Sequence, residues 1–200
     1  MFVKICGITN SQDALDAVAF GADALGFIFA ESPRKISPSL AREIVKLLPV
    51  EIITVGVFRN QDARQVIDTV RDAGLTGAQL HGHESPQQVA EVMKVVKWVT
   101  KSVIAGSSEA RNADKYGTET ILVDSPHPGT GTGYDLNLID QLPSSLRVIL
   151  SGGLSVSNVA QSIKTVSPWG VDVSSGVELS PGRKDKTKML DFITNARSNC

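Results

Sequence analysis

Short apolar runs alternate with amphipathic segments along the whole 200-residue chain. Apolar runs of four to eight residues are typical of buried strands, and apolar side chains repeating every three or four residues are typical of helices. The alternation predicts strands at 2–6, 22–29, 52–58, 76–80, 96–103, 120–123, 147–150 and 169–173. It predicts helices at about 10–20, 38–48, 61–73, 86–93, 108–116, 136–141, 155–164 and 184–196.

Eight strand-then-helix units predict parallel strands covered by helices. This number favours an α/β fold consisting of a single (β/α)8 TIM barrel with an eight-stranded parallel sheet, occupying residues 1–200 as one domain. The alternative is an open doubly wound sheet, which usually has a glycine-rich turn after its first strand and an acidic residue about 20 positions later. Only Gly7 follows the first strand, and Asp23 begins the second strand instead of ending it. The barrel is therefore the better prediction.

The overall composition is that of an ordinary globular domain, with 42% hydrophobic and 20% charged residues. A formal net charge of −1 provides no general attraction for nucleic acid or anionic membranes, so we expect neither as a partner. Residues 1–7 lack the basic region and long apolar run of a signal peptide, and no apolar run approaches the 18 residues of a membrane helix. Cys6 and Cys200 fit no disulfide framework; they could bridge if the termini met in space, but a reducing environment is the simpler interpretation. We expect a cytoplasmic protein, with a monomer as the simplest oligomeric state.

In a barrel of this kind, the chemistry lies at the carboxyl ends of the strands. The predicted strands or the loops directly after them carry Cys6, Arg34, Arg59, His81, Asp124, Ser151 and Ser174. Polar loops occur on both rims of any barrel, so the identity of these groups matters more than their number.

Two loops predict a phosphate site. Ser151, Gly152 and Gly153 follow the seventh strand, and Ser174, Ser175 and Gly176 follow the eighth. Small residues let backbone N–H groups approach an anion, and a short helix beginning near Gly176 would add its positive end. Barrels often bind phosphate at this pair of strands. The alternative is that the glycines only form tight turns.

Two residues are candidates for proton transfer. Asp124 ends a buried strand, where desolvation favours the protonated form and therefore a general acid; the alternative is a role in capping the following loop. Cys6 ends the first strand, and on local grounds it resembles an inert core thiol. Alternation places Lys4 on the same face as Cys6, hence inside the barrel, and a buried ammonium needs a counter-charge. Asp172 in the eighth strand is the candidate for that charge.

Arg34 and the histidines each allow two interpretations. Arg34 could grip a substrate carboxylate through its planar guanidinium or could be a solvated loop charge. His81 and His83 suggest a metal, but His83 lies beyond the strand and His127 is the only other histidine. We therefore predict no metal.

In this order, the motifs resemble the phosphoribosylanthranilate isomerase family of tryptophan biosynthesis over essentially the whole chain. The similar segments are 4–9 (KICGIT), 21–27 (GADALGF) with 32–34 (SPR), 55–58 (VGVF), 79–82 (QLHG), 150–154 (LSGGL) and 171–178 (VDVSSGVE). Each segment is modest evidence alone, but the series is specific.

The resemblance implies an Amadori rearrangement of N-(5-phosphoribosyl)anthranilate without metal or organic cofactor. It implies Asp124 as general acid and Cys6, as thiolate, as general base, which reverses the local interpretation of Cys6. It implies that Arg34 holds the anthranilate carboxylate and that His81 and Asp172 line the substrate site. Backbone groups of Gly152, Gly153, Ser174, Ser175 and Gly176 are the implied phosphate ligands.

One segment departs from the family pattern. Where the family commonly has Gly-Lys-Thr-Phe-Asp-Trp after the sixth strand, residues 131–136 read GTGYDL, without the lysine and the tryptophan. This puts in doubt how the loop closes over the substrate more than which reaction occurs.

Two rival functions remain. The analogous isomerisation in histidine biosynthesis uses a related barrel, but that family has aspartate at the first strand end, where this chain has Cys6. The other rival is a catalytically silent phosphate-binding barrel. The presence of Cys6, Arg34 and Asp124 together argues against it.

Overall fold

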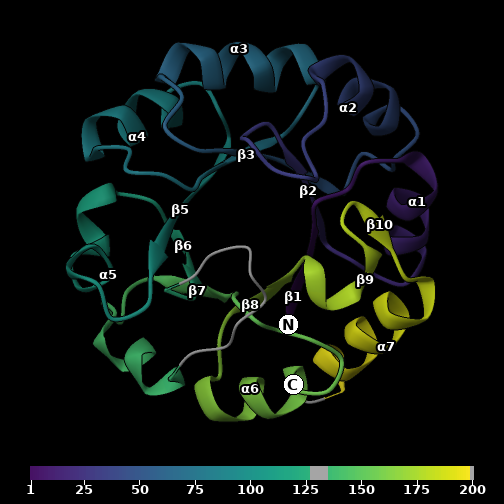
Figure 1. Ribbon diagram of the computed structural model, residues 1–200. Helices are drawn as coiled ribbons and strands as arrows, with labels where there is room; N and C mark the ends of the chain where they lie inside the picture. Colours follow the sequence, from purple (N-terminus) through teal and green to yellow (C-terminus); the bar gives the residue numbers. More distant parts are fainter. Residues whose placement is uncertain (127–134, 199–200) are drawn as a thin grey trace.

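The computed structural model describes residues 1–126 and 135–198. Within them, eight parallel strands form a closed ring with helices outside it (Figure 1). The strands are β1 (Phe2–Cys6), β2 (Ala24–Ile28), β3 (Ile53–Phe58), β4 (Gly77–Leu80), β5 (Trp98–Ile104), β6 (Thr120–Asp124), β7 (Arg147–Leu150) and β8 (Gly170–Val173). The predicted TIM barrel is thus confirmed.

Pairing between the first and last strands closes the ring. β1 pairs in parallel with β2 on one side and with β8 on the other, where Lys4 lies opposite Asp172. A doubly wound sheet would leave two edges, so this pairing excludes the open alternative.

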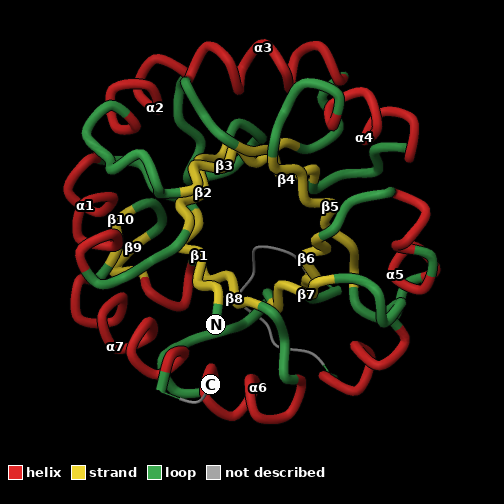
Figure 2. Tube along the Cα trace, turned by 180° about the vertical axis from the view of Figure 1, so that it is seen from behind, coloured by secondary structure: helices red, strands yellow, loops and turns green. Residues whose placement is uncertain are grey.

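Helices surround the barrel as an outer layer, as the view from behind also shows (Figure 2). They are α1 (Ser11–Ala19), α2 (Pro38–Val45), α3 (Ala63–Ala73), α4 (Pro86–Met93), α5 (Ser108–Arg111), α6 (Val159–Val166) and α7 (Lys186–Arg197). Short 3-10 helices are η1 (Ala113–Tyr116), η2 (Leu136–Gln141) and η3 (Ser175–Val177). No helix in the described ranges has both the length and the apolar character needed to cross a bilayer.

Local capping explains where these helices begin and end. The Asn10 side chain accepts a hydrogen bond from the Asp13 amide at 2.9 Å, as an N-cap does. Asp62 and Ser85 form capping boxes at the starts of α3 and α4. Gly74 ends α3 in the left-handed conformation at φ 67°.

Several elements differ from the prediction in their bounds, and the segment 136–141 is a 3-10 helix. The helix expected from 155 begins at Val159 because Asn158 holds a turn, accepting from the Ser155 amide and donating to the Gly153 carbonyl, both at 2.8 Å. The helix expected over 108–116 is divided at Asn112 into α5 and η1. An unpredicted hairpin of β9 (Glu178–Ser180) and β10 (Arg183–Lys184) precedes α7.

Alternation along the strands sorts side chains between the barrel interior and the helix layer. The register brings several polar residues to the interior, where they are almost completely buried. They are Lys4 and Cys6 on β1, Gln79 on β4, Asp124 on β6 and Asp172 on β8. Such groups need partners within the barrel.

Candidate active site

A cavity of about 200 Å³ opens at the carboxyl ends of the strands. All the strand-end residues predicted from the sequence line it: Cys6, Arg34, Arg59, His81, Asp124, Ser151 and Ser174. Gly152, Gly153, Asp172 and Ser175 line it as well, whereas Gly176 lies outside the lining. The structure therefore brings the predicted site together around one cavity.

Lys4 and Asp172 form an ion pair inside the barrel, as predicted. Lys4 Nζ lies 2.8 Å from Asp172 Oδ1, and the lysine is completely buried. Burial acts to lower the pKa of Lys4, but the charges of Asp172 and Cys6 outweigh it and raise the pKa above 10.5. Lys4 is therefore a permanent cation beneath the cavity.

Cys6 lies beside this cation. Burial raises the pKa of the Cys6 thiol above its ordinary value of 9.0, and the Asp172 charge adds to the rise. The charge and hydrogen bond of Lys4 and the charge of Lys184 act in the opposite direction. A methyl group at Gly26 would lie 2.7 Å from Cys6 Sγ and 3.2 Å from Lys4 Nζ, so this wall has room only for glycine.

A row of polar side chains leads from Lys4 across the barrel to Asp124. Lys4 Nζ donates to Gln79 Oε1 at 2.9 Å, and Gln79 Nε2 lies 2.8 Å from His81 Nδ1. His81 Nε2 lies 3.3 Å from Asp124 Oδ2. The other oxygen, Asp124 Oδ1, accepts from the Ser125 amide at 2.7 Å. The base candidate and the acid candidate are thus connected through Gln79, a residue to which the sequence assigned no role.

Arg34 is held by a carboxylate of the protein itself. Its Nε and Nη2 each lie 2.8 Å from an oxygen of Glu178, which also accepts from Lys184 Nζ at 2.9 Å. These bonds raise the pKa of Arg34; burial would raise the pKa of Glu178, but Arg34 and Lys184 lower it below 4.5. No site role was predicted for Glu178 and Lys184, because they lie about 150 residues from Arg34 in the sequence and no local pattern connects them.

The predicted phosphate loops are built from left-handed glycines and close packing. Gly152 and Gly153 have φ values of 82° and 71°, a region that disfavours other residues. A side chain at Gly176 would collide with the Leu154 carbonyl oxygen, so glycine lets the two loops approach each other. The buried Ser174 Oγ has no hydrogen-bond partner among the described residues.

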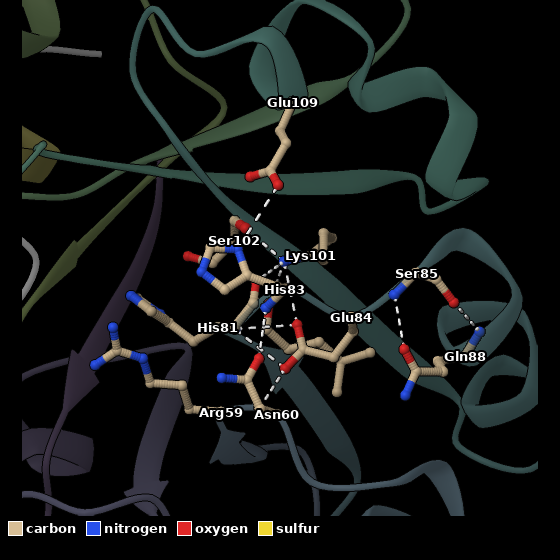
Figure 3. Close-up of polar contacts among 12 residues, drawn as sticks. Arg59, Asn60, His81, His83, Glu84, Ser85, Gln88, Lys101, Ser102 and Glu109 are labelled. Carbon is tan, nitrogen blue, oxygen red and sulfur yellow. Dashed lines mark hydrogen bonds and ion pairs between the residues drawn. The ribbon is translucent and has the colours of Figure 1, made fainter.

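A second buried lysine, Lys101 on β5, lies on the outer side of the strands, towards the helices (Figure 3). Lys101 Nζ lies 3.2 Å from Glu84 Oε2 and donates to the carbonyls of Leu80, Gly82 and Ser102. Glu84 in turn accepts from the amides of Asn60 and Gly82. These bonds hold the backbone on both sides of His81.

Some predicted features lie away from the cavity or outside the described residues. His83 is exposed and lies 3.7 Å from Glu109. Across residues 1–126 and 135–198, no cluster of three or more His, Cys, Asp or Glu side chains is arranged to hold a metal ion. Outside the described residues lie His127, Cys200 and residues 131–134 of the segment that differs from the family pattern.

A TIM barrel whose predicted proton-transfer and anion-binding residues surround one cavity is typical of enzymes that act on phosphorylated small molecules. Residues 3–195 match the family model for N-(5'-phosphoribosyl)anthranilate (PRA) isomerase. The chain belongs to this family, and it is an isomerase.

Individual relatives agree with this assignment. The chain is 42% identical to the N-(5'-phosphoribosyl)anthranilate isomerase of Bacillus cereus strain AH820, over 98% of both chains. Phosphoribosyl anthranilate isomerase from Thermus thermophilus has a similar structure, with a TM-score of 0.93, 36% identity and coverage of 99% of both chains. Another is a phosphoribosyl anthranilate isomerase in complex with reduced 1-(o-carboxyphenylamino)-1-deoxyribulose 5-phosphate, with a TM-score of 0.85, 38% identity and 99% coverage of both.

Proposed function

We propose that this chain converts N-(5-phosphoribosyl)anthranilate to 1-(2-carboxyphenylamino)-1-deoxyribulose 5-phosphate in tryptophan biosynthesis, with Asp124 as general acid and Cys6 as general base. The observation that carries the proposal is that both residues line one cavity whose rim is formed by the β7 and β8 loops. Membership of the family supports the reaction, and the geometry supports the roles.

The reaction begins at the ring oxygen of the sugar. Asp124 gives its proton to this oxygen, the C1–O bond breaks, and the nitrogen lone pair forms a Schiff base at C1. The Cys6 thiolate then removes the proton from C2, the electron pair of that bond forms the C1=C2 bond of an enolamine, and the π electrons of the C1=N bond return to the nitrogen. Tautomerisation adds a proton at C1 and releases one from the C2 hydroxyl. The enzyme returns to its starting state when Cys6 gives up its proton and Asp124 takes one up.

The raised pKa of Cys6 limits how much thiolate is present to remove the proton from C2. At neutral pH the thiolate is a minor species, because burial favours the neutral thiol. Lys4 is the nearest cation that stabilises the thiolate, which gives the buried ion pair a role in catalysis. The thiolate that does form is a strong base because it is poorly solvated.

Arg34 binds the anthranilate carboxylate in this proposal. Glu178 occupies the Nε and Nη2 edge of the guanidinium, which fixes the plane of the group. The second edge, formed by Nη1 and Nη2, is the one that would face the substrate carboxylate in bidentate fashion. Glu178 therefore orients Arg34 and need not leave when substrate binds.

The phosphate lies between the β7 and β8 loops. Backbone N–H groups of Gly152, Gly153, Ser174, Ser175 and Gly176 are the donors, and η3 presents its amino end to the same place. The Ser174 hydroxyl, which has no partner among the described residues, is a further donor. Asp172 and His81 contact the sugar between the two ends of the substrate.

The test is a fluorescence assay that follows loss of phosphoribosylanthranilate. We expect activity in the wild type and a decrease of about 10²- to 10⁴-fold in Cys6→Ser and in Asp124→Asn. Asp140→Asn makes the same chemical change on an exposed residue and should be fully active. Equal activity in all variants would overturn the mechanism, and an inactive wild type would overturn the function.

A further inference from the structure

The row from Lys4 to Asp124 has a fixed hydrogen-bond direction. An ammonium group has only donors, so the Gln79 atom that lies 2.9 Å from Lys4 Nζ must be the carbonyl oxygen Oε1. The raised pKa of Lys4 keeps the ammonium charged at neutral pH and maintains this direction. The orientation of the Gln79 amide is therefore set from β1.

This orientation decides which nitrogen of His81 carries a proton. With Oε1 facing Lys4, the amide NH₂ of Gln79 faces His81 Nδ1 at 2.8 Å. An NH₂ group can only donate, so Nδ1 must accept and cannot carry a proton. The doubly protonated imidazolium would oppose two donors and is disfavoured for the same reason. The remaining form is the neutral ring with its proton on Nε2.

The protonation state of His81 determines what Asp124 can do with its own proton. Nε2 lies 3.3 Å from Asp124 Oδ2, and contacts of this length often tighten when substrate binds. If Nε2 were bare, it would accept the Asp124 proton and keep it from the substrate. With a proton on Nε2, His81 can only donate to Oδ2, and the acid proton is directed elsewhere.

We propose that Gln79 is a positioning residue that holds His81 as the neutral tautomer protonated on Nε2, and thereby keeps the Asp124 proton available for the sugar ring oxygen. The inference rests on the proposed function in which Asp124 is the acid. Gln79 touches neither the acid nor the base directly; it acts through the ring of His81.

The surroundings of His81 favour the same arrangement. The titratable and charged groups that face it are Asp124 on β6, Lys4 behind Gln79, and Arg59, which lines the same cavity from the loop after β3. Asp124 is protonated in the proposed mechanism, so the two cations disfavour a second proton on the ring. Behind the backbone, Lys101 and Glu84 pair with each other and fix the chain on both sides of the histidine. The backbone that carries the ring is therefore held on both sides, and the ring itself contacts Gln79 through Nδ1 and Asp124 through Nε2.

Nitrogen NMR of the ¹⁵N-labelled protein tests the tautomer directly. The chain has three histidines, and loss of one signal set in His81→Asn assigns His81. We expect wild-type His81 to show a bare Nδ1 and a protonated Nε2 at neutral pH. In Gln79→Glu, the new carboxylate accepts from both Lys4 and Nδ1, so we expect the Nδ1 signal to become that of a protonated nitrogen. Gln87→Glu adds the same charge on the exposed side of α4 and should leave the His81 signals unchanged.

Kinetics then connect the tautomer with catalysis. We expect Gln79→Glu to lower kcat by at least tenfold with a smaller change in KM, and to alter the shape of the pH profile. Gln79→Met, which removes the hydrogen bonds without adding charge, should also lower kcat and should give a mixture of His81 tautomers. Gln87→Glu should match the wild type.

Each outcome bears on one part of the argument. A protonated Nδ1 in the wild type overturns the inference, whatever the activity. An altered tautomer in Gln79→Glu with unchanged kcat overturns the link to Asp124. An inactive wild type with a bare Nδ1 defeats the proposed function but leaves the control of the tautomer intact. Histidine signals without native dispersion in both Gln79 variants show instead that Gln79 is needed for folding, which contradicts a positioning role.

Discussion

Two lysines of this barrel are completely buried and paired with carboxylates, yet they face opposite sides of the same wall. Lys4 lies inside the barrel with Asp172, and Lys101 lies between the barrel and the helices with Glu84. Their pKa values move in opposite directions. Burial acts to lower both, but Asp172 and Cys6 raise the pKa of Lys4, whereas Glu84 does not compensate for Lys101, whose pKa is lowered.

The atoms that accept from the two ammonium groups explain the difference. Besides Asp172, Lys4 donates to the side chain of Gln79, which continues to the cavity. Lys101 donates to three backbone carbonyls and faces the Tyr116 ring at 5.4 Å. Bonds to side chains transmit charge and hydrogen-bond direction to the active site, while bonds to carbonyls hold loops in place. In our proposal, therefore, the lysine inside the barrel acts on the active site, whereas the lysine outside it stabilises the fold.

The largest effect should come from removing the inner lysine. Lys4→Met takes away the cation beside Cys6 and the group that orients Gln79, so we expect kcat/KM to fall by about 10²-fold or more. It also leaves Asp172 buried without its partner, at a cost of about 3–5 kcal/mol in the free energy of unfolding. Steady-state kinetics and urea unfolding measure both. Normal activity and stability in this variant would refute the assigned role of Lys4.

Removing the outer lysine should separate stability from activity. Lys101→Met leaves Glu84 buried without its cation, and we expect the free energy of unfolding to fall by about 3 kcal/mol. Activity per folded molecule should fall less than about tenfold, because no atom of Lys101 reaches the cavity lining. If kcat falls as far in Lys101→Met as in Lys4→Met, the distinction between a lysine that acts on the active site and one that acts only on stability is wrong.

A pH titration should sharpen the contrast. The pKa of Cys6 is raised above 9.0, so the thiolate fraction, followed by the ultraviolet absorbance of the thiolate, should still be rising as the pH increases through this region. The unfolded chain loses the thiol proton at lower pH than the folded one, so the same shift should lower the free energy of unfolding over this range. Lys4→Met should move the rise in thiolate absorbance to higher pH, and Lys101→Met should leave it in place. A profile in Lys4→Met that matches the wild type would show that Lys4 does not act on Cys6.

The smallest effect should come from His83, whose side chain contacts neither Lys4 nor Lys101 and lies on the surface. His83 follows His81 by two residues, but its side chain is 76% exposed and lies 3.7 Å from Glu109. His83→Ala should change the free energy of unfolding by no more than about 0.5 kcal/mol and leave kcat/KM unchanged. Thermal unfolding and the fluorescence assay measure these values. A marked loss of activity would revive the interpretation of this segment as a metal site.

The fold and the position of the cavity could be predicted because both follow from period and order. The strand alternation determined which residues face inward, and this was enough to predict the contact between Lys4 and Asp172. Gln79 was not found because a neutral amide on a strand carries no chemical signal until its neighbours are known. Glu178 and Lys184 were missed because an ion-pair network joins residues by their position in space and leaves no spacing in the sequence. The start of α6 depended on the side-chain bonds of Asn158, which compete with helix formation. The assignment of residues 1–200 to one domain stays a prediction.

The pairing of β1 with β8 has a consequence for how the chain can fold. Lys4 and Asp172 are register partners in this pairing, although 168 residues separate them. Burying this ammonium without its counter-charge is unfavourable, so a partly folded chain that has docked only its first strands should keep Lys4 hydrated. Closure of the ring and neutralisation of this charge are therefore one event. Fragments that lack the last strand should therefore hold their first strand only loosely.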